Sequence, residues 1–182
     1  MPSTRRARRG SLVWAGLIIA IGIGLAALAF VPLGVRPQAL VDSPLIGKPA
    51  PAIAGEDLDG RHWTLADAHG RLTWVNFWAT NCEPCRTEMP AMQRLAEAHP
   101  GDLLILGVDW GEGRDAVAGF AGRYGIHYPI LLDPRLENYY RWATSDGLPR
   151  HYFIDAHGTV VREVIGPLDP SAMVTILDEL LG

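Results

Sequence analysis

The chain has 182 residues, of which 48% are hydrophobic and 20% are charged, and its formal net charge is −4. This length accommodates one domain of ordinary size and an additional segment. Without the five arginines before residue 37, the chain has 11 basic and 20 acidic residues, which argues against nucleic-acid binding because that function requires a basic face.

The N-terminal segment has the pattern of a membrane anchor. Residues 1–11 contain four arginines and no acid, and residues 12–33 contain no charged side chain. An apolar helix of about 20 residues crosses the ~30 Å hydrocarbon core of a bilayer. The positive-inside rule then places residues 1–11 in the cytoplasm and the rest of the chain after residue 33 outside it, on the periplasmic side of the inner membrane. A signal peptide is the alternative, because Ala27 and Ala29 resemble a cleavage site, but the apolar run exceeds the usual ~7–15 residues.

The next segment, residues 34–51, is rich in proline and lacks periodicity, so it is interpreted as a linker to a domain of residues 52–182. Apolar periodicity and turn signals in this domain predict a hairpin, followed by alternating strands and helices and a closing hairpin with a helix. The expected segments are the hairpin 52–65, strand 72–79, helix 83–98, strand 103–108, helix 114–124, strand 128–132, helix 135–142, strands 150–154 and 159–164, and helix 171–181. This order predicts an α/β fold, in which a mixed central sheet has helices on both faces and an added N-terminal β-hairpin.

The two cysteines, Cys82 and Cys85, lie where the strand 72–79 meets the helix 83–98. The first turn of a helix has unpaired N–H groups and favours negative charge, so a thiol there is expected to be more acidic than the free value of ~8.5. Pro84 suits the start of the helix because its missing N–H is not needed there. The pattern predicts a redox couple, with Cys82 as the nucleophile and Cys85 as the resolving thiol.

Other uses of a cysteine pair fit the sequence less well. A structural zinc site requires four ligands and the chain has no further cysteine, so no metal site is expected. A structural disulfide across so short a loop would constrain the unfolded chain only weakly. Copper(I) binding by the two thiolates and His151 stays open as an alternative.

Three stretches together resemble the TlpA/ResA/CcmG (DsbE) type of membrane-anchored thiol–disulfide oxidoreductase, within the thioredoxin superfamily. They are VNFWATNCEPCRTEMP around the cysteines, GKPAPAIAGEDLDGRHWTLADAHGRL before them, and YPILLD with GLPRHYFIDAHGTVV after them. The resemblance covers roughly residues 46–181. It implies a thioredoxin-like fold and a monomeric protein-disulfide reductase that needs no cofactor. It also implies apocytochrome c as a substrate during cytochrome c maturation, and a membrane thiol–disulfide carrier as the electron donor.

The resemblance also implies roles for residues outside the cysteine pair. It implies that the Leu148–Pro149 bond is cis and faces the cysteines, where the backbone of these residues binds a substrate chain like an added strand. Glu88 is expected to accept the proton of Cys85, although it could equally be a solvated acid of the helix. Trp78 is expected to contact the substrate.

Glu83, Pro84 and Asn81 are expected to tune the site, and Asn76 and His151 are departures from the family pattern. Glu83 places negative charge beside the thiolate, which favours reductase character. Asn81 stands where relatives usually have tryptophan, so partner choice is expected to differ. Asn76 stands where thioredoxins have a buried aspartate, and an amide cannot relay a proton. His151 replaces a small polar residue, and it either faces the sulfurs or packs in the strand.

The sequence therefore predicts an extracytoplasmic thiol–disulfide oxidoreductase that reduces protein disulfides. A thiol peroxidase is the other enzymatic alternative, because such enzymes share the fold. Their pattern has a threonine three positions before the reactive cysteine, and this position is Ala79 here. The peroxidase alternative is therefore disfavoured.

Overall fold

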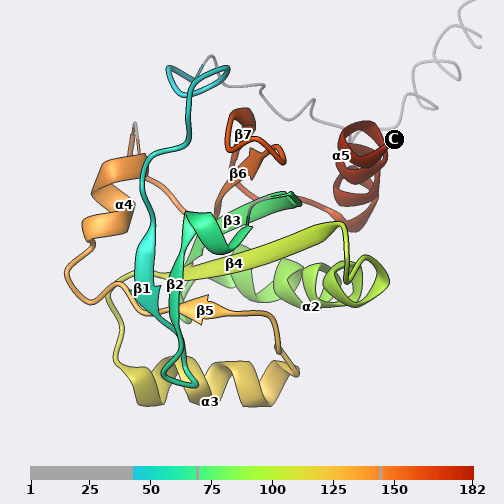
Figure 1. Ribbon diagram of the computed structural model, residues 1–182. Helices are drawn as coiled ribbons and strands as arrows, with labels where there is room; N and C mark the ends of the chain where they lie inside the picture. The colour runs from blue at the N-terminus through green and yellow to red at the C-terminus, as the bar shows by residue number, and fades with distance from the viewer. Residues whose placement is uncertain (1–42, 69, 144) are drawn as a thin grey trace, which may run out of the picture. The chain divides into compact units, whose positions relative to one another are not determined.

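The computed structural model describes residues 43–182 except residues 69 and 144 (Figure 1). The predicted membrane segment 12–33 and the basic segment before it lie outside these residues. Within the described part of the chain, none of the helices combines the length and the apolar composition needed to cross a bilayer.

The described elements follow the predicted order along the chain. In sequence they are β1 (Ala54–Glu56), β2 (His62–Thr64), the 3₁₀ helix η1 (Leu65–Ala68), β3 (Leu72–Trp78), α2 (Glu83–Ala98), β4 (Leu103–Asp109), α3 (Arg114–Tyr124), β5 (Ile130–Leu131), α4 (Glu137–Trp142), β6 (Arg150–Ile154), β7 (Val160–Ile165) and α5 (Pro170–Leu181). The last helix begins at Pro170, one residue before the expected start, and the side chain of its N-cap residue Asp169 accepts a hydrogen bond from the Ala172 N–H at 2.9 Å.

The central sheet is mixed, as predicted, with the strand order β5-β4-β3-β6-β7. Strand β3 pairs in parallel with β4 and antiparallel with β6, and β4 and β5 are parallel while β6 and β7 are antiparallel. All seven residues of β3 are buried, which explains why its sequence is a nearly continuous apolar run. The strand that leads to the cysteines therefore lies in the middle of the sheet.

The two faces of the sheet are covered by different helices, which confirms the predicted arrangement (Figure 1). Side chains of a strand alternate between the faces, so Trp74 and Trp78 of β3 enter one core cluster while Val75 and Phe77 enter the other. Helices α2, α3 and α5 pack on the first face. Helix α4, the strand β2 and η1 pack on the second.

The N-terminal hairpin of β1 and β2 forms a two-stranded sheet of its own, as predicted. It is joined to β5 by a bridge between Asp57 and Leu131 and by a hydrogen bond from the Leu132 N–H to the Glu56 carbonyl at 3.1 Å. The hairpin thus covers the end of the central sheet at β5.

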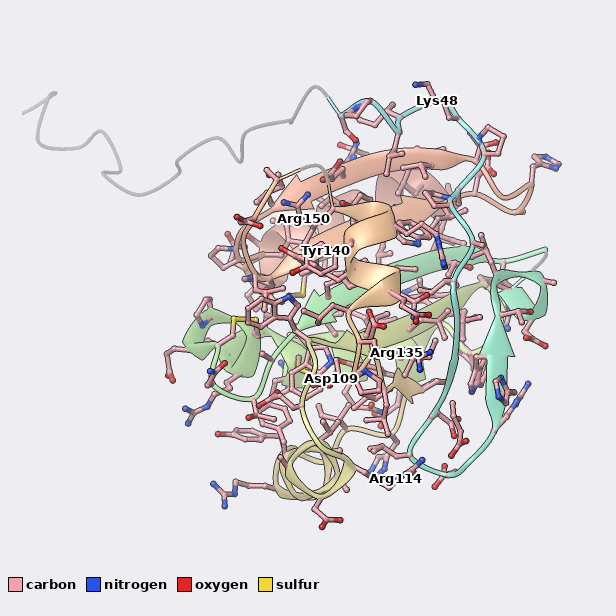
Figure 2. All side chains as sticks on the ribbon, turned by 90° about the vertical axis from the view of Figure 1, so that its left-hand side faces the viewer. Lys48, Asp109, Arg114, Arg135, Tyr140 and Arg150 are labelled. Atoms are coloured by element: carbon pink, nitrogen blue, oxygen red, sulfur yellow. A yellow bond between two sulfur atoms is a disulfide. The ribbon has the colours of Figure 1, made fainter. Side chains whose placement is uncertain are left out.

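The segment from Gly47 to Ala50, which the sequence assigned to a linker, is bonded to the start of β7. The Gly47 N–H donates to the Val160 carbonyl at 2.8 Å, and the Ala50 N–H donates to the Gly158 carbonyl at 2.8 Å. Figure 2 shows Lys48 at the top of the view, where the first described residues run beside the last strands. The ordered domain therefore includes residues before 52.

Two elements are shorter than the sequence predicted. Strand β5 has two residues rather than the five of the expected 128–132, partly because Pro129 has no N–H to donate. Helix α4 begins at Glu137 instead of residue 135, because Leu136 adopts a left-handed conformation with φ 58°. A turn closed by the Leu136 N–H and the Asp133 carbonyl at 2.8 Å occupies the residues before it.

Candidate active site

The two cysteines form a disulfide at the amino end of α2, where the sequence placed them. Their Cα atoms are 5.3 Å apart, and Cys82 is the N-cap residue of the helix. The Cys85 N–H points at the Cys82 sulfur at 3.3 Å. The same N–H group would stabilise a thiolate at Cys82 after reduction, because the helix end favours negative charge.

The two sulfur-bearing residues differ in their access to solvent. Cys82 is half-buried, whereas the exposed fraction of Cys85 is 0%. An incoming disulfide can therefore reach Cys82 but not Cys85. This difference matches the predicted roles of attacking and resolving cysteine.

The Leu148–Pro149 peptide bond is cis, as the family resemblance implied. Strand β6 begins directly after it, and Arg150 of β6 pairs with Phe77 of β3. Because β3 leads into the cysteine loop, Pro149 lies at the same end of the sheet as Cys82. Leu148 is half-buried and Pro149 is buried.

Trp78 requires a correction. It was expected to contact the substrate, but its exposed fraction is 0% and its ring packs on Phe120 of α3, with the ring centroids 4.7 Å apart. The structure therefore places Trp78 in the core rather than on the substrate-binding surface.

Glu88 lies one helical turn after Cys85 and is 3% exposed, so it is not a solvated acid of the helix surface. One carboxylate oxygen accepts the Leu168 N–H at 3.2 Å, and the other accepts the Asn76 side-chain N–H at 3.4 Å. The His151 Nε2 atom lies 3.5 Å from the second oxygen. A buried carboxylate beside the resolving cysteine is suited to accept its proton, and this role stays a prediction.

His151 is fully buried, with its ring enclosed by polar side chains of the sheet and of α2. Its Nδ1 atom lies 3.2 Å from the Trp74 indole nitrogen and 3.2 Å from the Asn76 amide nitrogen. Among the described residues, no three His, Cys, Asp or Glu side chains are arranged to hold a metal ion. The copper alternative therefore lacks a ligand set in this part of the chain.

The surface around the disulfide carries an ion pair. Glu83 and Arg86 approach to 3.0 Å, with side-chain exposed fractions of 76% and 39% respectively. Arg86 therefore offsets part of the negative charge that Glu83 places beside Cys82. Asn81 is exposed and presents an amide where relatives usually have an aromatic ring.

A further acidic contact, which was not predicted from the sequence, shapes the loop before Cys82. The Glu112 carboxylate accepts both the N–H and the hydroxyl of Thr80, each at 2.5 Å. The Glu112 N–H donates in turn to Asp109 at 2.7 Å. Glu112 lies 30 positions after Cys82, and the only hint was the acidic Asp109 at the end of an apolar strand.

Asp109 is a buried acid at the end of β4, below α4 in the view of Figure 2. Burial, together with the neighbouring Glu112 and Asp133 carboxylates, raises the pKa of Asp109 to about 7, against the lowering effect of the Glu112 N–H. Asp109 is therefore partly protonated at neutral pH, and Glu112 holds the cysteine loop.

The chain is similar to known proteins along the whole domain. Residues 46–163 match the model of the AhpC/TSA family. The thiol:disulfide interchange protein DsbE of Allochromatium vinosum is 32% identical over 154 residues, which cover 83% of each chain. The thiol-disulfide oxidoreductase ResA of Bacillus subtilis is 33% identical over 126 residues, or 69% of this chain and 70% of ResA.

Solved structures support the same assignment. The crystal structure of a thiol:disulfide interchange protein of the thioredoxin family from Chlorobium tepidum is 29% identical, with a TM-score of 0.66. The match covers 78% of this chain and 100% of that one. The fold described above is therefore thioredoxin-like.

Proposed function

Because the chain belongs to the AhpC/TSA family and is a thiol–disulfide oxidoreductase of the DsbE and ResA type, we propose that it reduces disulfides in other proteins outside the cytoplasm. The observation that carries this proposal is the half-buried Cys82 beside the fully buried Cys85. This arrangement exposes one sulfur to a large substrate and keeps the other for an internal reaction.

The proposed reaction has two exchanges and needs no cofactor. The Cys82 thiolate attacks one sulfur of the substrate disulfide, forms a mixed disulfide and releases the other sulfur as a thiolate. Cys85 then attacks the Cys82 sulfur, which breaks the mixed disulfide and releases the second substrate thiolate. The substrate gains two electrons, and the protein is left with the Cys82–Cys85 disulfide.

Two protons accompany the two electrons. Glu88 takes the proton from the Cys85 thiol as that sulfur attacks, and the released substrate thiolates are protonated by solvent. The oxidised protein returns to its dithiol form by exchange with a reduced thiol carrier in the membrane. The carrier therefore supplies the electrons that the substrate receives.

The proposed substrate class is apocytochrome c, whose haem-attachment cysteines must be free thiols before the haem is joined. The arginines of residues 1–11 and the uncharged residues 12–33 support a membrane-anchored domain outside the cytoplasm, where oxidation would otherwise join these cysteines. The DsbE relative supports a role in disulfide interchange.

Trapping the mixed disulfide tests this proposal. Cys85→Ser should arrest the reaction after the first exchange and leave the substrate joined to Cys82. Mass spectrometry of the trapped complexes should identify proteins with a C-x-x-C-H haem-attachment motif. Cys82→Ser is the matched control and should trap none of them.

Other results of the trapping experiment would contradict the proposal. If Cys85→Ser traps nothing, the dithiol mechanism does not operate in the cell. Trapping of unrelated disulfide proteins would retain the reductase activity and exclude cytochrome c maturation as its purpose.

A further inference from the structure

A group of buried polar side chains lies beneath α2, on the face of the sheet that the cysteines share. It comprises Trp74 and Asn76 of β3, Glu88 of α2 and His151 of β6, each no more than 3% exposed. Buried polar atoms without partners are costly, so the donors and acceptors of such a group are usually matched. Asn76 Oδ1 and His151 Nε2 have no hydrogen-bond partner among the described residues, and the contacts of the other atoms indicate which atom carries each proton.

Trp74 determines the tautomer of His151. The indole nitrogen of Trp74 can only donate, and it lies 3.2 Å from His151 Nδ1. Nδ1 must therefore accept, and the neutral ring carries its proton on Nε2. The Nε2–H group then faces Glu88 Oε1 at 3.5 Å.

The same tautomer determines the orientation of Asn76. The Asn76 amide nitrogen lies 3.2 Å from His151 Nδ1 and 3.4 Å from Glu88 Oε1, both of which accept. The reversed amide would place its oxygen against two acceptors, so the amide must present its two N–H groups. With the Leu168 N–H at 3.2 Å, three donors then face the Glu88 carboxylate.

We infer that His151 is a positioning residue for the resolving step, in which it holds Glu88 as an ionised proton acceptor for Cys85. This inference rests on the proposed reductase mechanism and adds a residue to it. The Nε2–H group of His151 lies 3.5 Å from Glu88 Oε1 without forming a hydrogen bond in this structure, and its dipole favours the carboxylate form of Glu88. His151 itself stays neutral, since a proton on Nδ1 would oppose the Trp74 N–H.

In this step the proton moves from Cys85 to Glu88, which lies three residues further along α2. The S–H bond of Cys85 breaks and an O–H bond forms on Glu88, while the Cys85 sulfur forms the new disulfide and the substrate thiolate leaves. Tyr128 also faces Glu88, and burial and the Glu88 charge raise the pKa of Tyr128 well above its ordinary value, so it keeps its proton. Among the described residues, no Lys or Arg side chain forms an ion pair with Glu88.

The test uses the reduced full-length chain and an aromatic disulfide that releases a coloured thiol at each exchange. The first release reports the attack of Cys82, and the second reports the attack of Cys85. His151→Leu removes the donor at nearly constant volume. The acidic limb of the second release should move to higher pH by up to about one unit, because loss of the Nε2–H dipole beside Glu88 favours the protonated acid.

Two further variants distinguish positioning from packing. His151→Gln keeps an N–H group that can reach Glu88, so the second release should return toward the wild-type profile. Trp74→Phe frees Nδ1 for a second proton, and a cationic ring beside Glu88 should move the acidic limb to lower pH. The first release should keep its pH profile in all three variants. Ring ¹⁵N NMR should also show the Nε2–H tautomer in the wild type and its loss near neutral pH in Trp74→Phe.

Each result decides the inference independently of the cellular function. If the second release keeps the wild-type pH profile in His151→Leu, or if both releases shift together, His151 does not position Glu88. A doubly protonated ring in the wild type at neutral pH would also overturn it. Failure of the Cys85→Ser trap in cells, with these shifts present, would refute only the proposed physiological reduction.

Discussion

Two neighbouring residues of β6, Arg150 and His151, point to opposite faces of the sheet and illustrate two uses of a buried charge partner. Both side chains are fully buried beside a carboxylate: Arg150 lies 2.9 Å from Glu163, and His151 lies 3.5 Å from Glu88. Arginine stays charged under all ordinary conditions, whereas histidine can change its charge near neutral pH. The pair that can respond to protons is on the face with the cysteines.

Hydrogen bonds of Arg150 hold the residues before the cis Leu148–Pro149 bond in place. Its guanidinium donates to Glu163, to the Tyr152 hydroxyl at 3.2 Å, and to both the carbonyl and the hydroxyl of Ser145. The Tyr152 hydroxyl donates in turn to the Trp142 carbonyl at 2.9 Å. Arg150 thus ties α4 and the loop before Pro149 to the sheet, so it acts on the site by fixing backbone.

Breaking the arginine pair should give the largest effect. Arg150→Met leaves Glu163 buried opposite no cation, so we expect the free energy of unfolding to fall by about 3–5 kcal/mol. Urea denaturation measures this loss. The double variant Arg150→Met with Glu163→Leu should recover most of it because no unpaired charge is left. A loss below about 1 kcal/mol in the single variant would show that the two sides of β6 do not differ in this way.

Asp109 is a buried acid that forms no ion pair among the described residues, in contrast to Glu163, which pairs with Arg150. The pKa of Asp109 is raised to about 7 from the ordinary value 3.8, so the folded protein keeps a proton that the unfolded chain has already released. Stability should therefore fall as the pH rises from about 4 to about 7, by an amount of order 4 kcal/mol.

Asp109→Asn removes this pH dependence. The amide oxygen can still accept the Glu112 N–H, so the variant should be more stable than the wild type at pH 8 and should show a flatter profile below pH 7. Thermal unfolding across this interval provides the measurement. Asp178→Asn, which changes an exposed acid of α5, is the control and should retain the wild-type slope. A steep profile in Asp109→Asn would assign the proton to another group.

The exposed ion pair at the active site should contribute least to stability. Glu83→Gln should change the free energy of unfolding by less than about 0.5 kcal/mol, because exposed pairs are screened by solvent. It should nevertheless raise the reduction potential by about 10–30 mV. Without the negative charge of Glu83, the Cys82 thiolate and therefore the reduced form are more stable. Equilibration with glutathione buffers measures the potential.

Glu179→Gln is a matched control for this variant. It breaks the Arg162–Glu179 pair, which spans 2.6 Å and joins β7 to α5, away from the cysteines. Stability should change as little as in Glu83→Gln, while the potential should stay at the wild-type value. Equal potentials in the two variants would show that Glu83 does not tune the couple.

Local patterns predicted most of the fold. The apolar run of β3 and the spacing of apolar residues in α2 are properties of adjacent residues, so their sequence identifies both elements. The two-residue β5 and the left-handed Leu136 escaped prediction, because they depend on a proline in the strand and on a turn whose conformation is unusual for leucine. The cis bond at Pro149 was expected only through the family resemblance.

In the candidate site, too, features of adjacent residues were predicted and contacts between distant residues were not. The cysteine pair follows from a contiguous motif, and the structure joins the two residues in a disulfide, whereas their division of labour stays a prediction. The contacts of His151 and Glu112 join residues that are distant in the chain, so no spacing rule reveals them. Trp78 was misplaced because its position next to the motif does not indicate on which face of β3 its side chain lies.

The segment from Gly47 to Ala50 has a consequence for how the domain folds. Pro49 bridges to Thr159, which follows it by 110 positions. Contacts between such distant positions form late, because a long stretch of chain must be ordered before the two ends meet. This contact can close only after residue 159 is available, so the N-terminal part of the domain joins the sheet late in folding.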